Sequence, residues 1–306
     1  MRHHALVCLG LACLPWLHGA ARAAGESSLA RGIAGALAES GSPGRDVRRR
    51  AAEVIPLDRL AAADRLLVEQ TVERTTLHRR LPTASIACDS ALLDFMLSKP
   101  EALVEVWRVL GISRLALDPV GPSQWRLADG YGTVGSVRLL HRERHERGGL
   151  HVFHGRGGYD GPLAPKRLTG SCVVVVRHTR AADAADGTPR QSVQIDAFLD
   201  VDGVGLELVT RTLQPLIVRS AAANLHEISL FISQFAAAAA RNPAAVSRIA
   251  DRMSRTPPAD RAALVTLASG RHATPPRVAA SSAEQVQAEL AARWMSTEQL
   301  DALERR

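Results

Sequence analysis

The sequence of 306 residues contains few aromatic residues, only 4%, and among its 38 basic residues only Lys99 and Lys166 are lysines. Proteins that bind nucleic acid usually gather positive charge on one face and interleave aromatic side chains that stack on bases. The densest basic clusters, residues 45–50 and 138–147, contain no aromatic residue, and Glu143 and Glu146 dilute the second. The net charge of +7 therefore indicates a solvated surface, and no nucleic-acid partner is expected.

Long hydrophobic runs are also scarce, which excludes a membrane protein with several spans. Hydrophobic residues nevertheless make up 46% of the chain and charged residues 23%, so the aliphatic side chains suffice for a core and a disordered polymer is excluded. A chain of this length is expected to form one or two domains.

The N-terminus has the order of a secretory signal peptide. Arg2 precedes an apolar run from Ala5 to Leu17, and the small-residue site Ala21-Arg22-Ala23 follows. Residues 1–23 are therefore predicted to be removed and the protein to be periplasmic or extracellular. The run is too short for a permanent transmembrane helix. Acylation at Cys13 is a poorer alternative, because it leaves a very short apolar segment.

Cleavage after Ala23 would remove two of the four cysteines and leave Cys88 and Cys172 in a compartment that permits oxidation. One disulfide between them is allowed. Two separate buried thiols are equally compatible with the sequence, because the spacing does not show whether their Cα atoms lie within about 7 Å.

Helical patterns dominate the chain before Gly111. Residues 24–80 form a predicted leader with one amphipathic helix between Leu57 and Leu77. A short strand is expected at 84–87, then a helix capped by Asp89 or Ser90, then a second helix from Pro100 to about Leu110.

After Gly111 the pattern alternates with a period of two, as in strands with one buried face. The predicted strands are 114–117, 124–128, 133–142, 149–154, 171–178, 191–200 and 204–213. Asp202-Gly203 suits a hairpin turn between the last two, so the sheet should be antiparallel. A long helix ending at Asn242-Pro243 follows, and a helical extension over 243–306 contains a linker at 272–282 and further helices at 244–254, 259–268 and 283–303.

This order of elements over residues 81–242 resembles the helix-grip fold of the START-like superfamily. The stretch from Ala197-Phe198-Leu199 through residues 212–216 to Asn224 and Phe231 is also similar to a group of exported helix-grip proteins without an assigned function. The resemblance implies an α+β fold in which a curved antiparallel sheet wraps a long C-terminal helix around an apolar cavity. It implies no shared catalytic residue, because members of the superfamily bind lipids, sterols or polyketides and only some catalyse a reaction.

Signatures of common cofactor, metal and nucleophile sites are missing. No G-x-S-x-G, C-x-x-C or phosphate-binding loop occurs. Gly130 to Gly135 matches G-x-G-x-x-G, but a strand pattern follows it, so a turn between strands is predicted. His151 and His154 are three residues apart on a strand and should point to opposite faces. No metal site and no cofactor are therefore expected.

Three polar residues are candidates for binding or acid–base chemistry. If Leu139 lies opposite Val152, His141 and His154 share a mainly apolar sheet face, where they could orient a ligand or move a proton. Two histidines hydrogen-bonded in the core would give the same pattern. Asp196 lies on the other face of the predicted last hairpin, beside Arg211, and a salt bridge between them is the simpler interpretation.

The predicted ligand-binding wall consists of apolar residues of the last hairpin and the closing helix, namely Ile195, Ala197, Leu199, Leu206, Leu208, Ile228, Ile232 and Phe235. The first hypothesis is an exported, non-enzymatic binding module for an apolar or amphipathic ligand such as a lipid. The second is a structural envelope protein with a filled core that docks a protein partner. The third is a hydrolase, cyclase or isomerase that uses His141 or His154 with Asp196.

Overall fold

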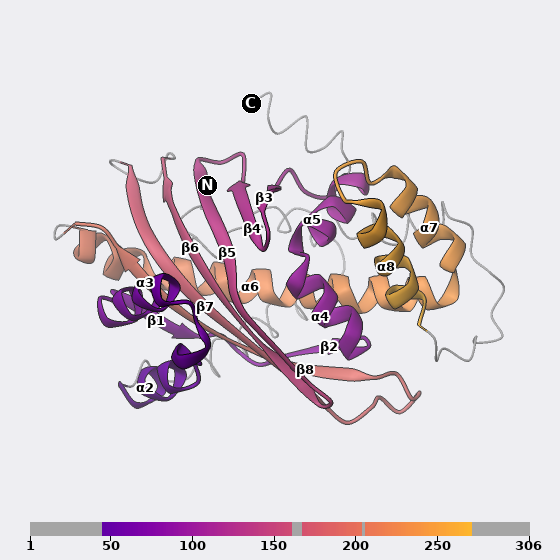
Figure 1. Ribbon diagram of the computed structural model, residues 1–306, viewed down its shortest axis with the longest axis horizontal. Coiled ribbons are helices and arrows are strands. Elements are labelled where there is room, and N and C mark those ends of the chain that lie inside the picture. The colour runs from indigo at the N-terminus through magenta and orange to yellow at the C-terminus, as the bar shows by residue number, and fades with distance from the viewer. Residues whose placement is uncertain (1–44, 161–166, 204–205, 271–306) are drawn as a thin grey trace.

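The computed structural model describes residues 45–160, 167–203 and 206–270, except for the side chains of residues 206–220. The predicted signal peptide, the linker at 272–282 and the predicted helix at 283–303 lie outside these residues. The fold is α+β: helices cover both faces of a curved antiparallel sheet (Figure 1). None of the described helices is long and apolar enough to span a membrane.

The sheet has eight described strands in the order β1-β8-β7-β6-β5-β4-β3, with β2 also pairing with β8. The strands are β1 (Leu77–Arg80), β2 (Ala84–Ala87), β3 (Ala116–Gly121), β4 (Gln124–Ala128), β5 (Thr133–His145), β6 (Gly148–Tyr159), β7 (Leu168–Arg180) and β8 (Arg190–Val201). All of these pairings are antiparallel. The prediction of an antiparallel sheet is therefore confirmed, and most strands extend beyond their predicted ends.

The helices are α2 (Arg45–Glu53), α3 (Ala62–Glu73), α4 (Ser90–Ser98), α5 (Pro100–Val109), α6 (Leu206–Arg241), α7 (Pro243–Arg252) and α8 (Pro258–Ser269), with a 3₁₀ turn, η1 (Leu57–Arg59), before α3. Two of these helices, α4 and α7, begin at a side-chain cap. The Asp89 carboxylate accepts a hydrogen bond of 2.7 Å from the backbone N–H of Ala91, and the Asn242 side chain caps α7 in the same way. Pro100 and Pro243 occupy the first turns of α5 and α7, where no N–H is needed.

The predicted hairpin at Asp202-Gly203 is wrong. The predicted strand at 204–213 falls largely in α6, so Leu206 and Leu208 belong to a helix and the wall facing β8 is not formed by a ninth strand. The physical reason is that both edges of β8 already form hydrogen bonds with other strands. β7 pairs along one edge, and β1 and β2 divide the other between them, so no hydrogen-bonding groups remain for a further strand.

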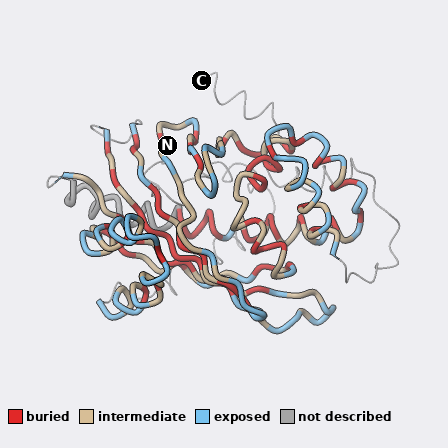
Figure 2. Tube along the Cα trace, viewed as in Figure 1, coloured by how far each residue is buried: buried red, intermediate tan, exposed pale blue. Residues whose placement is uncertain are grey.

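The two faces of the sheet carry separate apolar cores. The larger core lies between the sheet and α4, α5 and α6, and includes Ile195, Ile232 and Phe235 (Figure 2). The smaller core packs α2, η1 and α3 on the other face, around Val68 and Phe198. The predicted leader boundary at residue 80 therefore differs from the structure: residues 45–80 cover one sheet face and supply β1 to the edge of β8.

Cys88 and Cys172, whose pairing the sequence does not decide, are both buried, and no disulfide joins them. Cys88 follows Ala87, which pairs with Arg190 at the start of β8, whereas Cys172 lies opposite Leu199 near its end. Nine residues of strand separate these positions by about 30 Å. That is far beyond the Cα separation of about 7 Å that a disulfide permits.

The glycine-rich segment at 130–135 forms the turn between β4 and β5, as predicted, together with the first residues of β5. The Asp129 carboxylate accepts hydrogen bonds from the backbone N–H groups of Tyr131 and Thr133. Gly130 and Gly132 have φ angles of 74° and 103°, which explains why glycine is needed there. The carboxylate occupies the N–H groups that a phosphate would need, so the segment is a turn.

Candidate functional site

The three polar candidates from the sequence lie on one sheet face but do not form a cluster. His141 on β5 is opposite Val152, which is opposite Val175 on β7, which is opposite Asp196 on β8. Three strand spacings of about 4.8 Å place His141 roughly 14 Å from Asp196. An acid–base pair between them is therefore not formed.

The predicted register around His141 is wrong by one residue. A bulge between Leu139 and His141 pairs Leu139 with Phe153 and His141 with Val152. The extra residue turns Val137 and Leu139 toward the larger core, while His141 and His154 face the smaller core under α2 and α3. The two histidines thus point away from α6, where a cavity was expected to lie.

His141 and Asp196 have local partners, whereas His154 Nε2 is buried without a hydrogen-bond partner among the described residues. His141 Nε2 lies 3.5 Å from Glu143, and His154 is buried on the face where Arg138 binds Asp64. Burial, followed by the charge of Arg138, lowers the pKa of His154 and favours its neutral form.

Asp196 is fully buried and binds two arginines. Arg80 donates to both carboxylate oxygens at 2.9 and 3.1 Å, and Arg177 donates to Oδ2 at 2.8 Å. His78 Nε2 lies 3.4 Å from Oδ1. Burial alone raises the pKa of Asp196, but the hydrogen bonds from His78 and Arg80 outweigh it and lower the pKa. Asp196 is thus an anchor between β1, β7 and β8 that is ionised at neutral pH, with Arg80 taking the role predicted for Arg211.

The predicted wall residues that the structure describes belong to the larger core. Ile195, Leu199, Ile232 and Phe235 are buried, and Ala197 and Ile228 are partly buried against them. Leu206 and Leu208 lie in the part of α6 whose side chains are not described.

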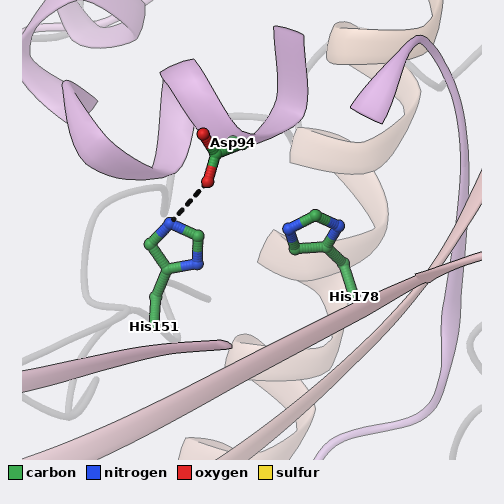
Figure 3. Close-up of side chains that lie close together, drawn as sticks. All are labelled: Asp94, His151 and His178. Carbon is green, nitrogen blue, oxygen red and sulfur yellow. Dashed lines mark ion pairs between the residues drawn. The ribbon is translucent and has the colours of Figure 1, made fainter. Parts of the chain in front are cut away.

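A polar cluster that the sequence did not predict lies on the sheet face of the larger core. Figure 3 shows its side chains. His151 on β6 and His178 on β7 point toward Asp94 on α4. The exposed fractions of the three residues are 1% or less. One donor atom from each residue lies within 4.8 Å of the donor atoms of the other two. We call these three residues the His-Asp cluster.

The sheet register brings the two histidines together. His151 lies opposite Val176 and His178 lies opposite Gly149, so the histidines are diagonal neighbours on adjacent strands, with ring centroids 6.0 Å apart. Gly149 makes room for them. A Cβ at this position would lie 2.7 Å from His178 Nε2 and 2.8 Å from the backbone oxygen of Glu143.

Asp94 is held from two sides. His151 Nε2 lies 3.3 Å from its Oδ1, and Ser98 Oγ lies 3.5 Å from the same nitrogen. Arg142 donates through Nε to Oδ1 at 3.2 Å and through Nη2 to Oδ2. Burial alone raises the pKa of Asp94, but the hydrogen bonds from His151 and Arg142 outweigh it and hold the pKa well below its usual range. The carboxylate is therefore ionised at neutral pH.

The histidines retain unused nitrogen atoms. His151 Nδ1 and both ring nitrogens of His178 are buried and form no hydrogen bond of normal geometry, although Gln191 lies beside His178. Burial and then the neighbouring His151 lower the pKa of His178, which favours the neutral imidazole. Buried polar atoms without partners cost about 1–3 kcal/mol each, so their presence at one place requires an explanation.

The donor set suits a first-row transition metal ion. Two imidazoles and one carboxylate form the three-ligand set of many zinc and iron sites, with a remaining position for water or substrate. Tetrahedral nitrogen and oxygen ligands about 2.1 Å from zinc lie about 3.4 Å apart. Asp94 and His151 already meet this distance, and the donor atom of His178 lies within 4.8 Å of both.

The sequence contains a chemical signal for this cluster, the histidine pair His151 and His154, but only one of the two belongs to the cluster. His151 and His154 indeed lie on opposite faces, as predicted. The partner of His151 is His178, from the next strand, and recognising it requires the register between β6 and β7. Asp94 is an acidic residue among the apolar residues of α4, and its burial there depends on the docking of that helix on the sheet.

Comparisons with known proteins add no functional assignment. No protein-family model matches the chain, and no curated protein sequence matches it. Among solved structures, the chain is similar to an uncharacterised protein from Rhizobium leguminosarum, with 11% sequence identity and a TM-score of 0.26. The similarity covers 49% of this chain and 93% of that protein, and a TM-score this low carries no argument about fold or function.

Proposed function

We propose that this protein binds a divalent transition-metal ion at the His-Asp cluster. The observation that carries the proposal is the convergence of Asp94, His151 and His178 from three separate elements, where three ring nitrogens form no hydrogen bond of normal geometry. An ion at their centre would bind one nitrogen of each histidine, and a ring nitrogen of His178 that forms no hydrogen bond of normal geometry would then gain a partner. Asp94 is already ionised and His178 favours its neutral form, so these two ligands are in the protonation states that metal binding needs.

The nature of the ligands narrows the choice of ion. Imidazole nitrogen favours zinc, iron, nickel or copper over magnesium and calcium, which prefer oxygen ligands. Zinc is the natural probe, because it accepts three protein ligands in a tetrahedral site and undergoes no redox change. Magnesium and calcium serve as negative controls.

The test is zinc binding by the mature protein after removal of metal with a chelator. Isothermal titration and metal analysis should find one zinc ion per chain, with thermal stabilisation of about 2.7 kcal/mol when free zinc is 100 times its dissociation constant. Absence of stoichiometric zinc binding would contradict the proposal.

The variant His178→Gln should weaken zinc binding by at least about 100-fold, because it removes one of three ligands. His154→Gln is the matched control, since His154 is also buried and lies on the same strand as His151 but faces the other way. Circular dichroism spectra should show that both variants are folded. Equal zinc affinity of the two variants would place the ion elsewhere.

A second candidate function is the binding of an apolar or amphipathic ligand by a helix-grip domain. It is favoured by apolar side chains on the α6 face of the sheet, among them Val137 and Phe153, that are only partly buried. Extraction of the purified protein with organic solvent, followed by mass spectrometry, should then yield a stoichiometric lipid. An extract without such a compound would remove this candidate.

Export is also part of the proposal, and it rests on the predicted signal peptide. The N-terminal sequence of protein recovered from its native host should begin at or near Ala24. Soluble cytoplasmic protein that retains Met1 would contradict export.

A further inference from the structure

The side chains around the His-Asp cluster are strongly asymmetric in charge. Arg142 and Arg144 lie two residues apart on β5, on the sheet face of the cluster, and both are exposed. Arg142 binds Asp94 directly, and Arg144 lies opposite Gly149, the residue that contacts His178. Glu143, between them, points to the other face, where Arg59 binds it at 2.9 Å.

This arrangement leaves an excess of positive charge once a metal ion is present. In the metal-free protein, the carboxylate of Asp94 neutralises one of the two arginines. A divalent ion that takes up the Asp94 carboxylate would raise the formal charge of the group, with both arginines counted, to about +3. Charge of this size attracts an anion.

The exposure and the donor geometry of Arg142 suit the binding of such an anion. Its side chain is 44% exposed, whereas Asp94 beneath it is almost completely buried, so the guanidinium lies between solvent and the cluster. It already holds a carboxylate with two parallel donors, the geometry with which arginine binds carboxylate and phosphate oxygens.

We infer that the metal-loaded His-Asp cluster binds a small oxyanion, a phosphate or a carboxylate, that bridges the metal ion and Arg142. The inference rests on the proposed metal binding and names the class of ligand that the loaded site takes. One oxygen of the anion would complete the coordination of the ion, and another would accept hydrogen bonds from Arg142. In the metal-free protein Asp94 occupies the same donors, so metal and anion bind cooperatively.

The experiment compares zinc-loaded and zinc-free protein in titrations with inorganic phosphate and, separately, with acetate. Coupling between two ligands at neighbouring sites commonly reaches about 5- to 150-fold. We expect at least one of the two anions to bind tighter to the zinc-loaded protein by a factor in this range. The two titrations show whether phosphate or carboxylate is preferred.

The variant Arg142→Gln separates the anion site from the metal site. Its zinc affinity is measured first, because Arg142 also holds the Asp94 carboxylate, and the zinc-loaded variant should lose most of the coupling to the anion. Arg126→Gln is the control, since Arg126 is an exposed arginine on β4 and β5 separates it from the strands of the cluster. It should keep the full coupling.

The outcomes distinguish this inference from the metal proposal. Protein that takes up no zinc would overturn the proposed function and the inference together, and metal analysis alone would show it. Zinc-loaded protein whose affinity for both anions equals that of the zinc-free protein would overturn only the inference. So would an Arg142→Gln variant that keeps the wild-type coupling.

Discussion

Replacing Asp196 with Asn tests how the edge of the sheet is held together. The carboxylate is fully buried and binds Arg80 and Arg177, whose side chains are 26% and 28% exposed. The Asn side chain keeps the size but loses the charge, and its NH₂ group faces guanidinium donors. Two arginines then remain close together with no compensating charge.

The expected cost is about 3 kcal/mol of unfolding free energy at pH 7, at the lower end of the range for breaking a buried ion pair by removing one partner. Arg80 and Arg177 can each turn partly toward water, which keeps the cost from rising further. Asp118→Asn is the matched control. Asp118 pairs with Arg255, and both side chains are about half exposed, at 50% and 51%, so this change should cost at most about 1 kcal/mol.

The effect should depend on pH in a defined direction. Because the pKa of Asp196 is lower in the folded protein, its contribution is fully present above the unfolded pKa of about 3.9 and is lost as pH falls through the folded pKa. The stability difference between the wild type and Asp196→Asn should therefore be largest at neutral pH and shrink below about pH 4.

Urea unfolding followed by circular dichroism at pH 7 and at pH 3 measures both quantities. An Asp196→Asn variant as stable as the wild type at pH 7 would refute the assignment of Asp196 as a structural anchor. A stability difference that is the same at both pH values would show that charge is not its cause.

Two further predictions concern other positions. Gly149→Ala should destabilise the metal-free protein by about 1–3 kcal/mol, because the new Cβ would lie 2.8 Å from a backbone oxygen that cannot move aside; thermal melting checks this, and an unchanged melting temperature would contradict it. Burial raises the pKa of Cys88 to about 12, so its thiol should react with alkylating reagents only on unfolding, and a reductant should leave the melting temperature unchanged; rapid labelling of the folded protein at pH 8 would contradict the burial.

The sequence by itself determined most of the local structure. Asp89 and Pro100 defined the starts of two helices, because these residues satisfy or replace backbone N–H groups within one turn, and Asn242-Pro243 defined the end of α6. Alternation of apolar and polar residues located seven segments as strands, and six of them are strands in the structure. Signals of this kind act within a few residues and need no knowledge of the rest of the chain.

The segment that begins at Val204 shows where such signals fail. Its alternation suits a strand, and Asp202-Gly203 suits a hairpin, but β1 and β2 already pair with the edge of β8. Residues more than a hundred positions away thus decided that Leu206 starts a helix. The strand propensity of a short segment does not depend on whether the neighbouring strand has an unpaired edge.

Only the tertiary structure assembled the candidate site. One bulge between Leu139 and His141 moved His141 to the face under α2 and α3, since an extra residue reverses the direction of every side chain beyond it. The segment between Tyr159 and Leu168 is too long for turn type to set the register of β6 and β7, and that register alone places His178 beside His151. Asp94 then joins them because α4 packs across these strands, a contact that depends on the shape of the whole core.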